Sequence, residues 1–129
     1  MKLNFRAWTE EGEVMYYDVY PFKNDTLLLS YDEISFDEVP VSDFILMQST
    51  GLKDKNGSEI FEGDIVKYKV GLNTYTEEVA YDKGFAGFGV RDAKANVIFT
   101  FGELAEDIDL HSLEVIGDVY ENPELLEGE

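Results

Sequence analysis

Short stretches of alternating apolar and polar residues, separated by turn residues, make up most of the chain. The segment Leu3–Trp8 alternates in this way and predicts a strand whose apolar face carries Leu3, Phe5 and Ala7. A polar turn at residues 10–13 follows, and residues 14–20 are again rich in aromatic and β-branched side chains. This order predicts a β-hairpin formed by the first two strands.

The same pattern continues to the C-terminus and predicts further short strands. These cover residues 27–31, 65–70, 74–81, 85–90, 97–101 and 113–120. Residues 71–73 form the predicted hairpin loop between two of them, while residues 104–110 fit a helical turn or a loop. The acidic segment 32–43 predicts a surface connection and the most mobile part of the chain, because its charged side chains favour hydration.

The length of 129 residues predicts a single domain, and the many predicted strands with little helix predict an all-β or mainly β fold. Residues 46–121 are expected to form a small SH3-like barrel, with an N-terminal hairpin and acidic connection at residues 1–45 packed on it. Residues 122–129 are expected to be a C-terminal tail with a short helical turn. Asn122 would be its N-cap and Pro123 its first helical residue.

Composition narrows the classes of function. Ten basic and 28 acidic residues among 129 give a net charge of −18, which disfavours direct binding to nucleic acid or to an anionic membrane. Aromatic residues make up 14% of the chain, so we expect a folded core. The N-terminal residues lack a secretory-signal pattern, and no apolar stretch is long enough to span a membrane, so a cytoplasmic protein is expected.

Two acidic stretches resemble metal sites in part, but the spacing of their possible ligands does not favour metal binding. Asp54, Asn56 and Ser58 match the first positions of a calcium loop, but the required later glycine and glutamate are missing, so a turn is favoured. The alternating residues at 107, 109 and 111 lack a further ligand and are more typical of a hydrated loop. With no cysteine, one histidine and no nucleophile motif, we expect no metal, no cofactor and no catalytic residues.

Two features have both a structural and a binding interpretation. The turn Glu62–Asp64 fits a tight connection before a strand, and it also fits a recognition loop. Arg6 and Trp8 lie opposite the apolar face of the first strand. They could form an interface pair, or Trp8 could fill a second small core while Arg6 pairs with nearby acids.

Three blocks of sequence, in order, resemble the YopX family of phage and prophage proteins. The first block comprises residues 5–8 and 15–17; the second comprises residues 46–48, 50–57, 59–60 and 62–66; the third comprises residues 114–117 and 120–126. The departures are small: Thr9 stands where the family often has an acid, and Asp118 and Val119 stand where it often has Asn and Ile. The resemblance implies a phage-related, mainly β, intracellular protein, and it implies no catalytic residues.

The sequence thus favours a small acidic module that binds a host or phage protein, or another copy of itself, and that is not an enzyme. The candidate binding residues are Arg6, Trp8, Gln48, Thr50, Lys53, Asp54, Glu62 and Asp64. An alternative is a DNA mimic whose carboxylates occupy a basic groove on a host nucleic-acid-binding protein. An unrecognised enzyme is the third hypothesis.

Overall fold

A computed structural model describes residues 4–127, and the chain divides between residues 49 and 50 into two compact units. Each unit is mainly β and contains its own hydrophobic core. The mainly β fold class predicted from the sequence is therefore confirmed. Leu3 of the first predicted strand and the last two residues of the predicted tail lie outside the described residues.

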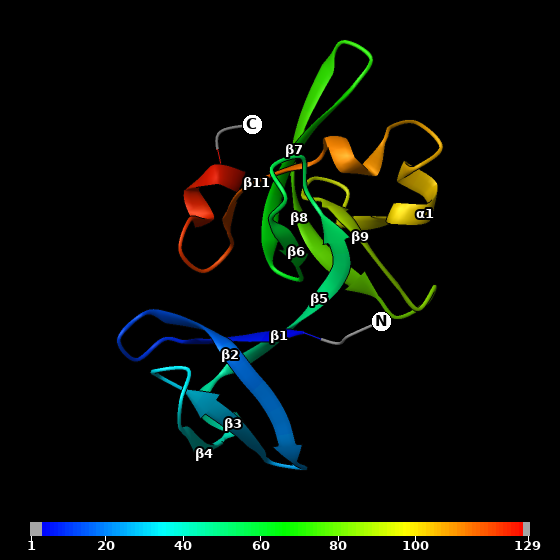
Figure 1. Ribbon diagram of the computed structural model, residues 1–129. Helices are drawn as coiled ribbons and strands as arrows, with labels where there is room; N and C mark the ends of the chain where they lie inside the picture. Colours follow the sequence, from blue (N-terminus) through cyan, green and yellow to red (C-terminus); the bar gives the residue numbers. More distant parts are fainter. Residues whose placement is uncertain (1–3, 128–129) are drawn as a thin grey trace. The chain divides into compact units, whose positions relative to one another are not determined.

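The first unit is an antiparallel sheet drawn in blue to teal in Figure 1. Its elements are β1 (Phe5–Thr9), β2 (Val14–Lys23), β3 (Thr26–Ser30), β4 (Phe36–Pro40), the 3₁₀ turn η1 (Val41–Asp43) and the start of β5 (Ile45–Lys53). Strand β1 lies between β2 and β5, and the predicted hairpin of β1 and β2 is confirmed by pairs such as Trp8 with Met15. The core of this sheet is Ala7, Val19, Leu27 and Leu29.

The acidic segment 32–43 is more regular than predicted. Residues 36–40 form β4, which pairs with β3 along its whole length, and η1 follows directly. The prediction of a plain connection was wrong because Val39 packs against the core while the other β4 side chains stay more exposed. A strand at the edge of a sheet tolerates such acids and a terminal proline, since one side of its backbone needs no partner.

The second unit holds a five-stranded antiparallel sheet and several short helical turns. Its elements are the end of β5, β6 (Glu59–Phe61), β7 (Asp64–Val70), β8 (Asn73–Asp82), β9 (Gly87–Asp92), β10 (Val97–Thr100), α1 (Phe101–Leu104), η2 (Leu110–Ser112), β11 (Glu114–Asp118) and η3 (Pro123–Leu126). The order β10-β9-β8-β7-β11 ends in two edge strands, so this sheet does not close into a barrel within the described residues. The SH3-like detail stays a prediction.

The ambiguous segment 104–110 holds the last residue of the helical turn α1 and the first residue of η2, and its residues 105–107 form a turn. Thr100 ends the strand because its side chain caps α1: the hydroxyl accepts the amide hydrogen of Glu103, and Glu103 accepts the amide hydrogen of Thr100. Phe101 and Leu104 of α1 then join the core formed by Ile60, Val66, Tyr68, Val79, Val90 and Leu113. Helix α1 is thereby held beside the sheet (Figure 1).

The helical turn predicted near the C-terminus is confirmed in position, but the predicted N-cap hydrogen bond of Asn122 is not formed. Pro123 begins η3 as expected, but the side chain of Asn122 makes no cap hydrogen bond. Its Oδ1 instead accepts the amide hydrogen of Asp118 at 3.2 Å. Asn122 therefore closes the turn after β11.

Strand β8 extends beyond the ladder that it forms with β9. It pairs with β7 over Asn73–Glu78, but with β9 only over Glu78–Asp82. Residues 73–77 consequently present a backbone edge outside the β9 ladder, in the green hairpin of Figure 1. This edge borders the candidate site.

Candidate functional site: an acidic cleft lined by aromatic rings

A cleft of about 470 Å³ lies in the second unit, lined by residues of β7 to β10, α1 and the turn after it. Its lining combines two kinds of side chain. The apolar and aromatic ones are Tyr68, Val70, Tyr75, Phe99 and Leu104, and the acidic ones are Glu77, Asp92, Glu103, Glu106 and Asp107. We call it the acidic cleft, because no Lys or Arg is among these described lining residues.

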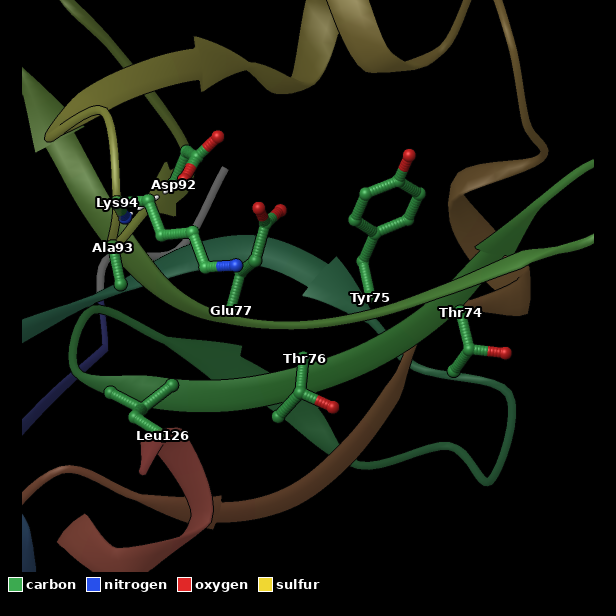
Figure 2. A pocket seen from close by; sticks show the side chains of 8 residues that line it. All are labelled: Thr74, Tyr75, Thr76, Glu77, Asp92, Ala93, Lys94 and Leu126. Carbon is green, nitrogen blue, oxygen red and sulfur yellow. Dashed lines mark hydrogen bonds between the residues drawn. The ribbon is translucent and has the colours of Figure 1, made fainter. Parts of the chain in front are cut away.

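A second pocket of about 340 Å³ adjoins the acidic cleft at the edge of β8. The two share Tyr75, Glu77 and Asp92, and the second adds Lys94 and, from η3, Leu126. Figure 2 shows Tyr75 and Glu77 on one side of β8 and Thr76 on the other. This alternation is the ordinary consequence of an extended strand, and it sends Tyr75 and Glu77 together toward the acidic cleft.

The floor of the acidic cleft is built around Tyr68. Its ring stacks on Tyr75, with centroids 5.4 Å apart and an angle of 22° between the planes. Its hydroxyl donates a hydrogen bond to Oε1 of Glu77. Burial, and then the neighbouring Glu77, raise the pKa of Tyr68, so its hydroxyl stays protonated and acts as a donor.

The surroundings of the Glu77 carboxyl disfavour its charged form. Burial raises its pKa, the hydrogen bond from Tyr68 lowers it in part, and the negative charge of Asp92 raises it again. The Asp92 carboxylate accepts amide hydrogens from Lys94 and Ala95 at 2.9 and 3.3 Å. A positive group placed between the two carboxylates would relieve the repulsion that they exert on each other.

The chemistry of the acidic cleft suits a cation with an apolar or planar body. Carboxylates accept hydrogen bonds from cationic donors, and aromatic faces attract cations through their electron-rich surface. Tyr75 is 38% exposed and Phe99 is 46% exposed, so ring surface is available to a ligand. Perturbed carboxyl groups in a cleft are also a general sign of a functional site.

The residues predicted from the sequence lie elsewhere. In the first unit, Arg6 is only 2% exposed and Trp8 only 5%, and Ala7 on the opposite face is 0% exposed, so both faces of β1 are covered. The guanidinium carbon of Arg6 lies 6.0 Å from the centre of the Tyr17 ring. Gln48 is partly buried and pairs with Phe5 in the ladder between β5 and β1.

Of the predicted residues in the second unit, Lys53 is exposed at the end of β5, while Thr50 is engaged within the fold. The Thr50 hydroxyl donates to the carbonyl of Ile60 at 2.8 Å and accepts the amide hydrogen of Leu52 at 3.1 Å. Thr50 therefore ties β5 to β6.

Asp54 is buried, and its carboxylate serves the backbone. Oδ1 accepts the amide hydrogens of Asn56 and Ser58, both at 2.9 Å, which confirms the turn favoured over a calcium loop. Oδ2 accepts the amide hydrogen of Val115. Burial alone would raise the pKa of Asp54, but the hydrogen bonds from Val115, Ser58 and Asn56 lower it on balance.

The turn Glu62–Asp64 joins several strands. Gly63 has a φ of 91°, a conformation that side chains disfavour, and its amide donates to the carbonyl of Val79 at 2.8 Å. Its carbonyl accepts the amide hydrogen of Val119 at 2.9 Å. Asp64 is buried and accepts the amide hydrogen of Phe61 at 2.7 Å, whereas Glu62 is partly exposed.

Tyr68, Tyr75, Glu77 and Asp92 are not among the candidate residues predicted from the sequence. One signal was present: Tyr75 and Glu77 are two residues apart in the predicted strand 74–81 and must share a face. The convergence of Asp92, Phe99 and Glu103 on that face depends on how β9, β10 and α1 pack, which periodicity alone does not reveal.

The matching family model, described as "YopX protein", covers residues 4–127, nearly the whole chain. The chain belongs to the YopX family. The resemblance found in the three sequence blocks is therefore confirmed.

Solved structures of two YopX-like proteins are similar to this chain over almost its full length. Protein EF1440 from Enterococcus faecalis is 30% identical with a TM-score of 0.66, and the match covers 98% of this chain and 99% of that one. Protein yopX from Bacillus subtilis is 30% identical with a TM-score of 0.61, covering 96% and 98% of the two chains. A search of curated proteins found no match. None of the helices in the described residues is long and apolar enough to cross a membrane.

Proposed function

We propose that this YopX-family chain is a small protein-binding module of the bacterial cytoplasm, of phage or prophage origin, and that its acidic cleft is the contact surface. The observation that carries the proposal is the lining of the cleft: exposed rings of Tyr75 and Phe99 lie among five carboxylates. Aromatic anchors in a concave surface are typical of protein-binding hot spots. The charge of −18 would steer basic partners toward the molecule.

Binding is favoured over catalysis by the way in which the cleft uses its titratable groups. Tyr68 has a raised pKa and donates to Glu77, so it offers a hydrogen bond and not an oxyanion nucleophile. Glu77 in turn faces a phenol and a second carboxylate, without the nucleophile and base arrangement of a hydrolase. These features support the proposal that the module acts by contact.

The test is capture from a bacterial lysate by the tagged full chain, compared with the variant Tyr75→Leu. A matched control is Tyr81→Leu, because Tyr81 lies on the same strand, is 40% exposed against 38% for Tyr75, and does not line the cleft. We expect proteins that bind the parent chain and Tyr81→Leu but not Tyr75→Leu. Capture that is equal for all three proteins would refute the cleft as the contact surface, and a nucleic-acid-binding protein captured in this way would favour DNA mimicry.

A second candidate is self-association through the first unit. Its sheet exposes Tyr20, Phe22 and Phe36 by 44%, 53% and 43%, and the rings of Tyr20 and Phe36 are 5.8 Å apart. Contiguous exposed apolar surface of this kind often marks an interface. Because each copy carries a charge of −18, added salt should strengthen self-association, whereas it should weaken binding of a basic partner.

Analytical ultracentrifugation of the purified chain at low and at high salt tests for self-association. The parent chain is expected to sediment as a larger species at high salt, and Phe36→Ser is expected to reduce this. A chain that remains a monomer at every salt concentration would exclude self-association as the function of this surface.

A further inference from the structure

We propose, on the basis of the protein-binding function above, that the acidic cleft receives the side chain of an arginine in an extended segment of the partner protein. The acidic cleft is a ready-made receptor for such a group because it combines flat aromatic surface, several hydrogen-bond acceptors and an adjacent strand edge. Each of these features contributes a separate part of the recognition.

The aromatic surface favours the planar guanidinium over a simple ammonium. Tyr75 is held by its stacking on the buried Tyr68, at 5.4 Å between centroids, so its exposed ring is positioned before any ligand arrives. A guanidinium can lie flat on such a ring and is less strongly hydrated than the ammonium of lysine. Stacking on a fixed ring therefore costs little in side-chain ordering.

The carboxylates supply acceptors around that ring. Glu77 lies two residues from Tyr75 on the same face of β8, and Asp92 on β9 raises the pKa of Glu77 by its charge. Glu103 of α1 stands on another wall of the cleft. The five N–H donors of arginine can reach acceptors on more than one wall, which a single ammonium cannot do as well.

The edge of β8 indicates why the arginine belongs to a protein segment and is not a free small molecule. Residues 73–77 lie outside the β9 ladder, and the two pockets meet at this edge. An extended segment can pair with an open strand edge through its backbone, while alternate side chains enter neighbouring pockets. Backbone pairing would place the arginine side chain over Tyr75 and Glu77.

The inference can be tested with a defined ligand in nuclear magnetic resonance titrations of the ¹⁵N-labelled full chain. The ligand is the blocked peptide Gly-Gly-Arg-Gly-Gly, compared with peptides in which lysine or the neutral isostere citrulline replaces the arginine. We expect chemical-shift changes at Tyr75, Glu77 and Asp92 with the arginine peptide, weaker changes with lysine and none with citrulline. Equal responses to arginine and citrulline, or changes spread over the whole acidic surface, would overturn the inference.

Paired variants separate the cleft from the general charge. Glu77→Gln should weaken binding of the arginine peptide by about tenfold or more, since it removes a charged hydrogen-bond acceptor. Glu78→Gln is the matched control, because Glu78 is the next residue of β8 and points to the opposite face. There its Oε1 forms an ion pair with Nε of Arg91 at 3.9 Å. Equal weakening by both variants would show a non-specific charge effect and would refute the cleft as the arginine site.

The peptide titrations and the lysate capture test two different statements, so either statement can be refuted while the other stands. If capture depends on Tyr75 but the arginine peptide does not bind, the module function stands and the arginine inference falls. If the peptide binds at the cleft but capture is unaffected by Tyr75→Leu, the arginine site stands and the proposed contact surface falls. The comparison of arginine with citrulline uses the parent chain, so it remains decisive even if a variant does not fold.

Discussion

The carboxylate of Asp54 accepts a hydrogen bond from the backbone amide of Val115 at 2.9 Å, although 61 positions separate the two residues in sequence. The same side chain also accepts the amide hydrogens of Asn56 and Ser58. One buried carboxylate thereby fixes a turn and attaches it to β11. Its part in the fold explains a conspicuous acid that the sequence suggested as a binding residue.

Replacing Asp54 by Asn should destabilise the protein by about 1–3 kcal/mol, because an amide N–H₂ group would face a backbone N–H donor and leave it without its acceptor. Urea unfolding followed by circular dichroism measures the change. Asp37→Asn in the exposed strand β4 is the control and should unfold like the parent chain. If Asp54→Asn lowered the free energy of unfolding no more than Asp37→Asn does, the hydrogen bonds of Asp54 would contribute little to stability.

The contribution of Asp54 should also depend on pH. Its pKa in the folded protein lies below the ordinary value of 3.8, so its stabilising effect is present above pH 3.8 and is lost as the pH falls through the lower folded pKa. The difference in unfolding free energy between the parent chain and Asp54→Asn should therefore shrink in acid. A difference that stays constant from neutral pH into strong acid would contradict the lowered pKa.

Glu77→Gln should have the opposite sign of pH dependence. The pKa of Glu77 in the folded protein is raised above 4.5, so its charged form costs stability at neutral pH, and this cost disappears as the pH falls through the raised value. The variant should be more stable than the parent chain at neutral pH, and the gap should close by about pH 4.5. Unfolding curves across this pH range test it, with the exposed Glu124→Gln as control.

Gly89→Ala should destabilise the second unit, because a Cβ atom at this position would overlap the carbonyl oxygen of Phe99. Strand β10 would have to move, at a cost of about 1–3 kcal/mol typical of an overfilled site. Gly87→Ala is the matched control on the same strand, since its nearest neighbour would be 3.8 Å away. Thermal unfolding of the two variants should differ by several degrees, and equal melting temperatures would refute the close approach.

The sequence by itself determined where most strands lie, the hairpin of β1 and β2, and membership of the YopX family. These features are local: alternation sets the faces of a strand, and turn residues such as Gly63 set its ends. The sequence also identified Asp54 and Asp64 as notable, but it could not show that backbone amides occupy their carboxylates.

Only the tertiary structure decided that β4 adds an edge strand, and that the five-stranded sheet stays open. It also brought Tyr75, Glu77, Asp92 and Phe99 to one cleft, although they belong to three strands. The physical reason is that pairing register and the packing of α1 depend on contacts between distant residues. Periodicity fixes which face a side chain occupies, but not which other strands bring their side chains to that face.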